Sequence, residues 1–186
     1  MVSDALMTAE ELLAYPVPHK RTELVNGRLV VREPAGFEHG RVAARLLVAV
    51  ATHVHATKTG EVLTAETGFT LHRQPDTVRA PDVAFVSHAT LAAHEAAGRS
   101  LRGFAELAPD LVVEVLSPDD RPGEVRDKVA DWLRAGTRLV WVVDPETRTA
   151  RMHLPDGIER AIPEDGALDG GEVLPGLLVA LGDVLT

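Results

Sequence analysis

Two carboxylates stand in segments of the sequence that otherwise consist of apolar residues. Asp82 precedes the run Val-Ala-Phe-Val, and Glu114 lies inside the run Leu-Val-Val-Glu-Val-Leu. Short β-branched and apolar runs of this kind are typical of buried strands. An ionised carboxylate in such a strand is costly unless a positive charge neutralises it. A hard cation shared by both carboxylates would do so, and we therefore predict a Mg²⁺ or Mn²⁺ site at Asp82 and Glu114.

A metal site of this type would suit the hydrolysis of a phosphate ester. A bound divalent cation activates water and stabilises the charge that develops on the phosphate. A nearby lysine adds positive charge without needing a fixed bidentate geometry. Lys128 is the only lysine after Lys58. On a helix over residues 122–135 it would lie roughly 60° from Val125, at the edge of the apolar face. Three neighbours on that helix are expected to point away from this face: Asp127, Asp131 and Arg134.

The same residues have ordinary structural explanations that the sequence leaves open. Asp82 could be a turn residue that enters a strand. Glu114 could form a buried ion pair with an arginine. Lys128 could extend along the edge of the core with its ammonium group in solvent.

Two further polar residues are candidates for the site. His39 begins a predicted helix, where it could contact a phosphate or position water, or could simply lie at the surface. Ser117 follows the strand that carries Glu114, but no base is paired with it in the sequence. We therefore do not expect a serine hydrolase.

The order of the predicted elements indicates one α/β domain spanning residues 1–186. Thr8 and Glu11 form a capping-box pattern at the start of a short helix that ends before Pro16. The Asn26-Gly27 pair predicts a tight hairpin. Hairpin strands are expected over residues 21–25 and 28–32, further strands over 61–71 with a break near Gly68, 82–86, 111–116, 138–143 and 148–153, and helices over 39–57, 89–97 and 122–135. Residues 158–172 are expected to be irregular, and residues 173–185 to form a closing edge.

The helix over residues 122–135 carries recognisable end signals. Pro122 fits the first helical position, and Gly136 fits the position just past the end. Asp119 or Asp120 can cap this helix or favour its positive end, and both are expected to serve as cap or turn residues.

The composition limits the class of protein. An apolar content of 45% with 25% charged residues is ordinary for a globular protein. The chain has no cysteine, which excludes disulfides, zinc–thiolate sites and a thiol nucleophile. No apolar run approaches the roughly 18–20 residues that span a bilayer, and the first eleven residues lack the pattern of a secretory signal. We therefore expect a cytoplasmic protein that is not inserted in a membrane.

The charge distribution leaves a nucleic-acid substrate possible. The net charge of −9 weakly opposes binding to a polyanion. Six of these nine excess negative charges lie beyond residue 143, however, so the rest of the chain is nearly neutral.

The order and spacing of several segments resemble those of the Uma-two family of bacterial endonucleases, once catalogued as a domain of unknown function. This family belongs to the PD-(D/E)XK, restriction-endonuclease-like superfamily. The likeness covers nearly the whole chain and is carried by residues 21–27, His39-Gly40, Pro81-Asp82, residues 111–118, 127–136, 139–145 and 173–177.

The resemblance implies a central mixed β-sheet flanked by helices, with an N-terminal helix and β-hairpin. It implies that Asp82 and Glu114 are metal ligands and that Glu23, on the hairpin, approaches the same site. The superfamily places a lysine two residues after the glutamate, where this chain has Leu116. In the Uma-two family the lysine comes from the following helix, which matches Lys128.

These inferences together predict a Mg²⁺- or Mn²⁺-dependent endonuclease that acts on DNA. Asp82 and Glu114 would hold the metal with the carbonyl of Val115, while Lys128, Glu23 and His39 would assist catalysis. A chain of this size would not surround a DNA duplex alone, so we expect a homodimer. Two alternatives stay open: an inactive binding protein with the nuclease fold, and a metal-dependent hydrolase of small phosphate esters.

Overall fold

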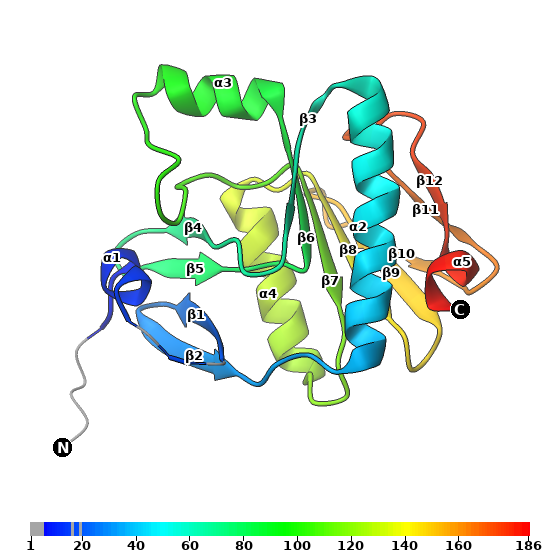
Figure 1. Cartoon of the computed structure of the whole chain (residues 1–186), viewed down its shortest axis with the longest axis horizontal. Helices are drawn as coiled ribbons and strands as arrows, with labels where there is room; N and C mark the ends of the chain where they lie inside the picture. The colour runs from blue at the N-terminus through cyan, green and yellow to red at the C-terminus, as the bar shows by residue number, and fades with distance from the viewer. Residues whose placement is uncertain (1–5, 16, 19) are drawn as a thin grey trace.

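The structure, a computed structural model, describes residues 6–15, 17, 18 and 20–186. The sequence prediction about Pro16, and the part of the signal-peptide prediction that concerns residues 1–5, lie outside these residues. The described chain forms a six-stranded sheet, a four-stranded sheet and a two-stranded sheet, with helices packed against them (Figure 1).

The six-stranded sheet is the centre of the fold. Its strand order is β10-β9-β8-β7-β6-β3. Strands β7 and β8 run parallel, and every other neighbouring pair is antiparallel. This confirms the predicted α/β architecture with a central mixed sheet. The strands are β3 (Gly60–Thr64), β6 (Val83–Ser87), β7 (Leu111–Val115), β8 (Leu139–Asp144), β9 (Thr149–His153) and β10 (Glu159–Ile162).

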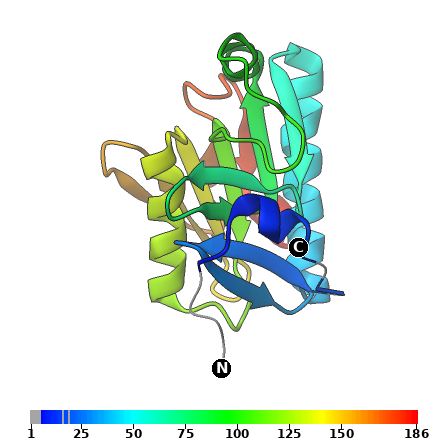
Figure 2. The ribbon, with the colours of Figure 1, turned by 90° about the vertical axis from the view of Figure 1, so that its left-hand side faces the viewer.

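Two helices, α2 (Phe37–Thr57) and α4 (Pro122–Ala135), cover opposite faces of this sheet (Figure 2). Alternation along the strands sorts the side chains, because successive residues of a strand point to opposite faces. In β6, for example, Phe85 packs on the α2 side and Ala84 on the α4 side. In the part of the chain that is described, no helix combines the length and apolar character needed to cross a membrane.

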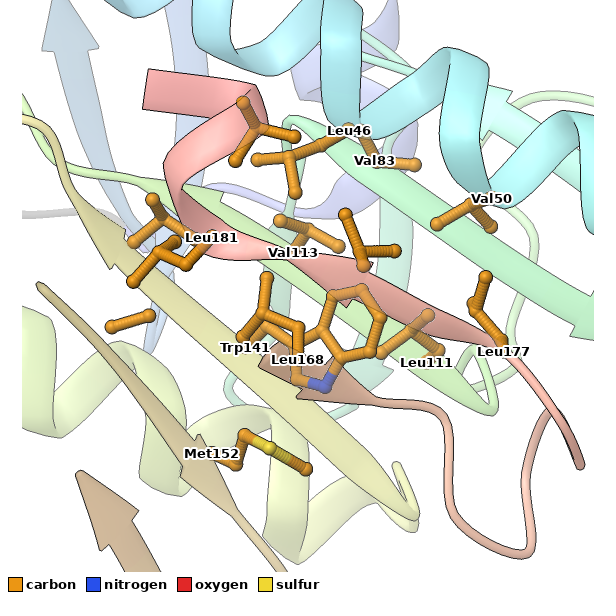
Figure 3. Close-up of a cluster of buried hydrophobic side chains, with 14 of the residues drawn as sticks. Leu46, Val50, Val83, Leu111, Val113, Trp141, Met152, Leu168, Leu177 and Leu181 are labelled. Carbon is orange, nitrogen blue, oxygen red and sulfur yellow. The ribbon is translucent and has the colours of Figure 1, made fainter. Parts of the chain in front are cut away.

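The larger core cluster lies between the sheet, α2 and the C-terminal segment. Figure 3 shows side chains from all three: Leu46 and Val50 from α2, Val113 and Trp141 from the sheet, and Leu168 and Leu181 from the C-terminal segment. This cluster lies on the face of the sheet opposite to α4.

The four-stranded sheet contains the predicted hairpin and has the order β2-β1-β5-β4. Asn26 and Gly27 both have positive φ, 49° and 75°, as a type I′ turn requires. The capping box of Thr8 and Glu11 is present at the start of the first helix. The elements here are α1 (Ala9–Leu13), β1 (Arg21–Val25), β2 (Arg28–Arg32), β4 (Phe69–His72) and β5 (Thr77–Arg79), and α3 (His88–Ala96) follows β6.

The C-terminal third differs from the sequence prediction in two places. Residues 158–172, expected to be irregular, contain β10 and β11 (Ala167–Asp169). The strand β10 is largely exposed and lacks an apolar alternation, so its pairing with β9 has no sequence signal. Residues 173–185 form β12 (Leu178–Ala180) and then α5 (Leu181–Leu185), because Leu181, Val184 and Leu185 have the spacing of a buried helix face.

At the start of α4, Asp120 has the expected turn role, but neither Asp119 nor Asp120 is the N-cap residue. Pro122 does stand at the helix start, and Gly136, with φ 111°, ends it. The N-cap residue, however, is Arg121, which makes no side-chain cap bond. Asp120 instead accepts a hydrogen bond from the Ser117 N–H at 2.8 Å, so it fixes the loop between β7 and α4.

Candidate active site

The residues predicted from the sequence come from the six-stranded sheet, the four-stranded sheet and two helices. Their contacts form two groups, Glu23–Lys128–Glu114 and His39–Asp82–Val115. Glu23 lies in β1, Asp82 immediately before β6, and Glu114 next to Val115 in β7. Lys128 extends from α4, and His39 lies in the first turn of α2.

Glu114 is a buried carboxylate with two protein donors. Its Oε2 accepts a hydrogen bond from Lys128 Nζ at 2.8 Å, and its Oε1 accepts one from Trp132 Nε1 at 2.8 Å. Burial raises its pKa to about 7: the attraction of Lys128 opposes this shift, while repulsion from Asp82 and Glu23 adds to it. Its proton is therefore held far more tightly than that of an ordinary glutamate.

Lys128 joins two of the carboxylates. Its Nζ lies 2.8 Å from Glu114 Oε2 and 3.2 Å from Glu23 Oε1, and only 21% of its side chain is exposed. Burial alone would lower its pKa, but the charges of Glu114, Glu23 and Asp82 outweigh burial and raise it. The ammonium group is thus fixed in the charged state beside Glu114.

The pKa of Glu23 is shifted in the opposite direction from that of Glu114. Its Oε2 accepts from Arg79 Nη1 at 3.0 Å, and its Oε1 accepts from the Ala80 N–H at 3.0 Å. Burial, the largest single effect, raises its pKa, but the charges of Lys128 and Arg79 together with these hydrogen bonds bring it down to about 2. Glu23 is therefore ionised at neutral pH and anchors Lys128.

Arg79 brings an unexpected residue into the network. Its guanidinium is 6% exposed and donates to Asp131 Oδ2 at 2.6 and 3.0 Å. Asp131 was expected only to point away from the apolar face of its helix, and its contact with Arg79 was not predicted. A buried guanidinium needs more than one acceptor. Glu23 is one acceptor for Arg79, and Asp131 in α4 is the second. Arg134 does point outward, with 69% of its side chain exposed.

Asp82 is fixed by donors from three elements. Its Oδ2 accepts from the Val115 N–H at 2.8 Å. Its Oδ1 lies 3.0 Å from His39 Nε2 and 3.1 Å from Arg21 Nη2. Burial raises the pKa of Asp82, but the hydrogen bond to His39, the charge of Lys128 and the Val115 N–H lower it below the usual value. Asp82 is thus an ionised carboxylate directed at the end of β7.

His39 also contacts Ser117. No feature of the sequence pairs these two residues. His39 Nδ1 lies 3.1 Å from Ser117 Oγ. The Ser117 N–H, which would be a natural donor to an oxyanion, is bonded to Asp120 instead. The Ser117–His39–Asp82 arrangement therefore does not favour acyl transfer, although the fold brings His39, 78 positions away, beside Ser117.

The donors present suit a hard divalent cation. No group of three or more His, Asp or Glu side chains among the described residues is arranged to hold a metal ion, so the candidate donors are two carboxylates with the main chain. An ionised carboxylate has about four lone-pair sites. Glu114 uses two of them on protein donors and Asp82 three, which leaves oxygen donors of the type that Mg²⁺ prefers.

The charge of the cluster favours the same conclusion. Four carboxylates share contacts with only three permanently charged cations, apart from the exposed Arg134. These are Glu23, Asp82, Glu114 and Asp131 against Arg21, Arg79 and Lys128. Burial is the main cause of the raised pKa of Glu114, and repulsion from Asp82 and Glu23 adds to it; a bound cation would relieve this repulsion.

Comparisons with known proteins identify the family. The family model Uma2, described as "Putative restriction endonuclease", matches residues 9–184. No curated protein matches the chain. A solved structure described as "a putative nuclease belonging to DUF820 from Anabaena variabilis ATCC 29413" is similar in fold, with a TM-score of 0.79 and 20% sequence identity over 96% of this chain and 97% of that one. With nearly its whole length matched, the chain belongs to the Uma2 family.

Proposed function

We propose that this protein is a nuclease that hydrolyses phosphodiester bonds of DNA with the help of a divalent metal ion. The observation that carries the proposal is the buried Asp82–Glu114 carboxylate pair with a permanently charged Lys128 bonded to Glu114. The family description of a restriction endonuclease supports the same reaction class. The fold match to a nuclease supports the architecture on which that chemistry is built.

Asp82, Glu114 and the carbonyl of Val115 would hold Mg²⁺ or Mn²⁺. The ion would supply two things when bound: activation of a water molecule and stabilisation of charge on the phosphate. The Val115 N–H already binds Asp82 Oδ2, so the same residue would fix one ligand and provide another.

Lys128 supplies a positive charge next to the reacting phosphate. Its ammonium group orients the attacking water or stabilises the negative charge of the pentavalent phosphorus. Glu23 holds this ammonium group in place from the other side, at 3.2 Å. His39 acts on Asp82, and its 3.0 Å contact orients that carboxylate.

One observation favours an inactive binding protein instead. All six carboxylate oxygens of Asp82, Glu114 and Glu23 already have a protein partner. Such a network could remain in a protein that has kept the nuclease fold and lost the activity. Calorimetry separates the two functions, because the inactive protein would not bind Mn²⁺ at millimolar concentration while still folded.

Plasmid cleavage tests the nuclease proposal directly. The wild-type protein is expected to nick supercoiled DNA with Mg²⁺ or Mn²⁺, and Asp82→Ala and Lys128→Ala are expected to abolish the nicking. Arg126→Ala is the matched control, since Arg126 is an exposed cation on the same helix as Lys128. Equal nicking by all four proteins would identify a contaminant and refute the proposal.

We also propose a homodimer located in the cytoplasm. A single chain of 186 residues is too small to surround a duplex alone. Two copies would place two sites on one DNA. The lack of cysteine is compatible with a reducing compartment. Sedimentation at micromolar concentration should give twice the mass of 20.0 kDa, and a monomeric mass would contradict the dimer.

A further inference from the structure

The hydroxyl of Ser117 is the outer end of a chain of contacts that ends on a candidate metal ligand. Ser117 Oγ lies 3.1 Å from His39 Nδ1, and His39 Nε2 lies 3.0 Å from Asp82 Oδ1. The His39 residue is 8% exposed. The imidazole is therefore held at both ring nitrogens inside the protein.

The main chain fixes Ser117 in the loop that follows β7. Its N–H donates to Asp120 Oδ2 at 2.8 Å, and its carbonyl accepts from the Asp120 N–H at 2.9 Å. The preceding Leu116 N–H donates to the Val143 carbonyl at 2.8 Å. Because these bonds do not involve the hydroxyl, replacing Ser117 by alanine should leave the loop intact.

The chemistry of the three groups gives the chain a direction. An ionised carboxylate can only accept hydrogen bonds, so Nε2 of a neutral His39 must carry the proton that faces Asp82. Nδ1 then has a lone pair, and the hydroxyl of Ser117 donates to it. Asp82 thus selects the tautomer, and Ser117 holds the ring plane of His39 from the other nitrogen, as the outer partners of metal-site residues commonly do.

The orientation of Asp82 depends on the ring plane of His39. Asp82 accepts bonds from Arg21, His39 and the Val115 N–H. Three of its roughly four lone-pair sites are used, so these donors decide where the remaining one points. An imidazole turned out of this plane would move its Nε2–H away from the carboxylate.

We infer that Ser117 is a positioning residue that acts through His39 to fix Asp82 in the orientation that binds a divalent cation. The inference rests on the proposed function, because it requires Asp82 to be a metal ligand. Removing an outer partner of this kind typically weakens metal binding about 10–100-fold.

The experiment combines Mn²⁺ calorimetry with nitrogen NMR of the His39 imidazole. The Ser117→Ala protein should bind Mn²⁺ at least about 10-fold more weakly than wild type, and the His39 Nε2–H signal should shift, because the hydrogen bond to Asp82 is disturbed. Ser117→Thr keeps a hydroxyl and should retain the wild-type affinity and Nε2–H signal. Ser100→Ala is the control, because His94 Nε2 lies 3.2 Å from the Ser100 carbonyl oxygen and does not use the hydroxyl.

The outcomes separate the inference from the function beneath it. If wild type binds Mn²⁺ and Ser117→Ala binds it equally well, the inference fails and the proposed function stands. Weaker binding by Ser117→Ala with an unchanged His39 Nε2–H signal also overturns the inference, since the effect would not pass through the imidazole. If folded wild-type protein binds no Mn²⁺ at millimolar concentration, the proposed function fails and takes the inference with it.

Discussion

Lys128 Nζ lies 2.8 Å from Glu114 Oε2, which joins the helix α4 to the strand β7 across 14 positions of the chain. A lysine two residues after the glutamate would fall at Leu116, whose side chain instead packs in the core cluster on the α4 side of the sheet. The ammonium group therefore reaches the carboxylate from the helix. For electrostatic stabilisation the position of the charge matters, and the element that delivers it does not.

Replacing Lys128 by alanine should affect both activity and stability. We expect nicking activity to fall by two orders of magnitude or more, since the positive charge beside the phosphate is lost. Removing one partner of a buried ion pair should also lower the free energy of unfolding by about 3–5 kcal/mol at pH 8. Urea unfolding and plasmid cleavage measure the two effects, and wild-type values for both would contradict the role of Lys128. Arg126→Ala should leave both values unchanged.

The two glutamates that contact Lys128 should give stability opposite pH dependences in metal-free protein. The pKa of Glu114 is raised from 4.5 to about 7, so its contribution is most favourable below pH 4.5 and is lost as pH rises to about 7. The pKa of Glu23 is lowered from 4.5 to about 2, so its contribution is present above pH 4.5 and is lost as pH falls toward 2.

Glutamine variants test these signs. At pH 7, Glu23→Gln should lower the free energy of unfolding by about 3 kcal/mol. Glu114→Gln should remove the fall in stability that wild type shows between about pH 4.5 and pH 7. Urea unfolding at pH 5 and pH 8 with a chelator gives the comparison, and an identical pH dependence in both variants would disprove the assignment.

The two tryptophans provide a matched pair. Trp132 Nε1 donates to Glu114 Oε1 at 2.8 Å, whereas Trp141 Nε1 is buried with no hydrogen-bond partner. Both side chains are fully buried. Trp132→Phe should therefore cost about 1.5–3 kcal/mol more than Trp141→Phe at pH 8, because only the first loses a bond to a charged group. Urea unfolding of the two variants decides, and an equal or larger cost at Trp141 would refute the hydrogen bond's contribution.

Local signals in the sequence predicted much of the fold. The Asn26-Gly27 turn, the capping box of Thr8 and the apolar runs around Glu114 each depend on neighbouring residues alone. The structure confirms the elements that they indicate. The exposed strand β10 and the short helix α5 were missed, because their formation depends on pairing and burial against distant segments.

Local signals in the sequence also predicted part of the candidate site. A carboxylate inside an apolar strand is visible in the sequence, as is a lysine at the edge of an apolar helix face. Arg79 and Asp131 are 52 positions apart, and His39 and Ser117 are 78 apart. Nothing in the sequence around these residues pairs them, since they meet only where α4 packs on the four-stranded sheet and α2 on the six-stranded sheet.

A crystal of the wild-type protein soaked in Mn²⁺ tests the central claim most directly. Anomalous scattering identifies manganese without reference to activity. We predict a single strong peak between the carboxylates of Asp82 and Glu114, within coordination distance of the Val115 carbonyl, that disappears in Asp82→Ala. An ordered crystal with no peak there, or with manganese bound only elsewhere, would contradict a metal-dependent nuclease site at this position.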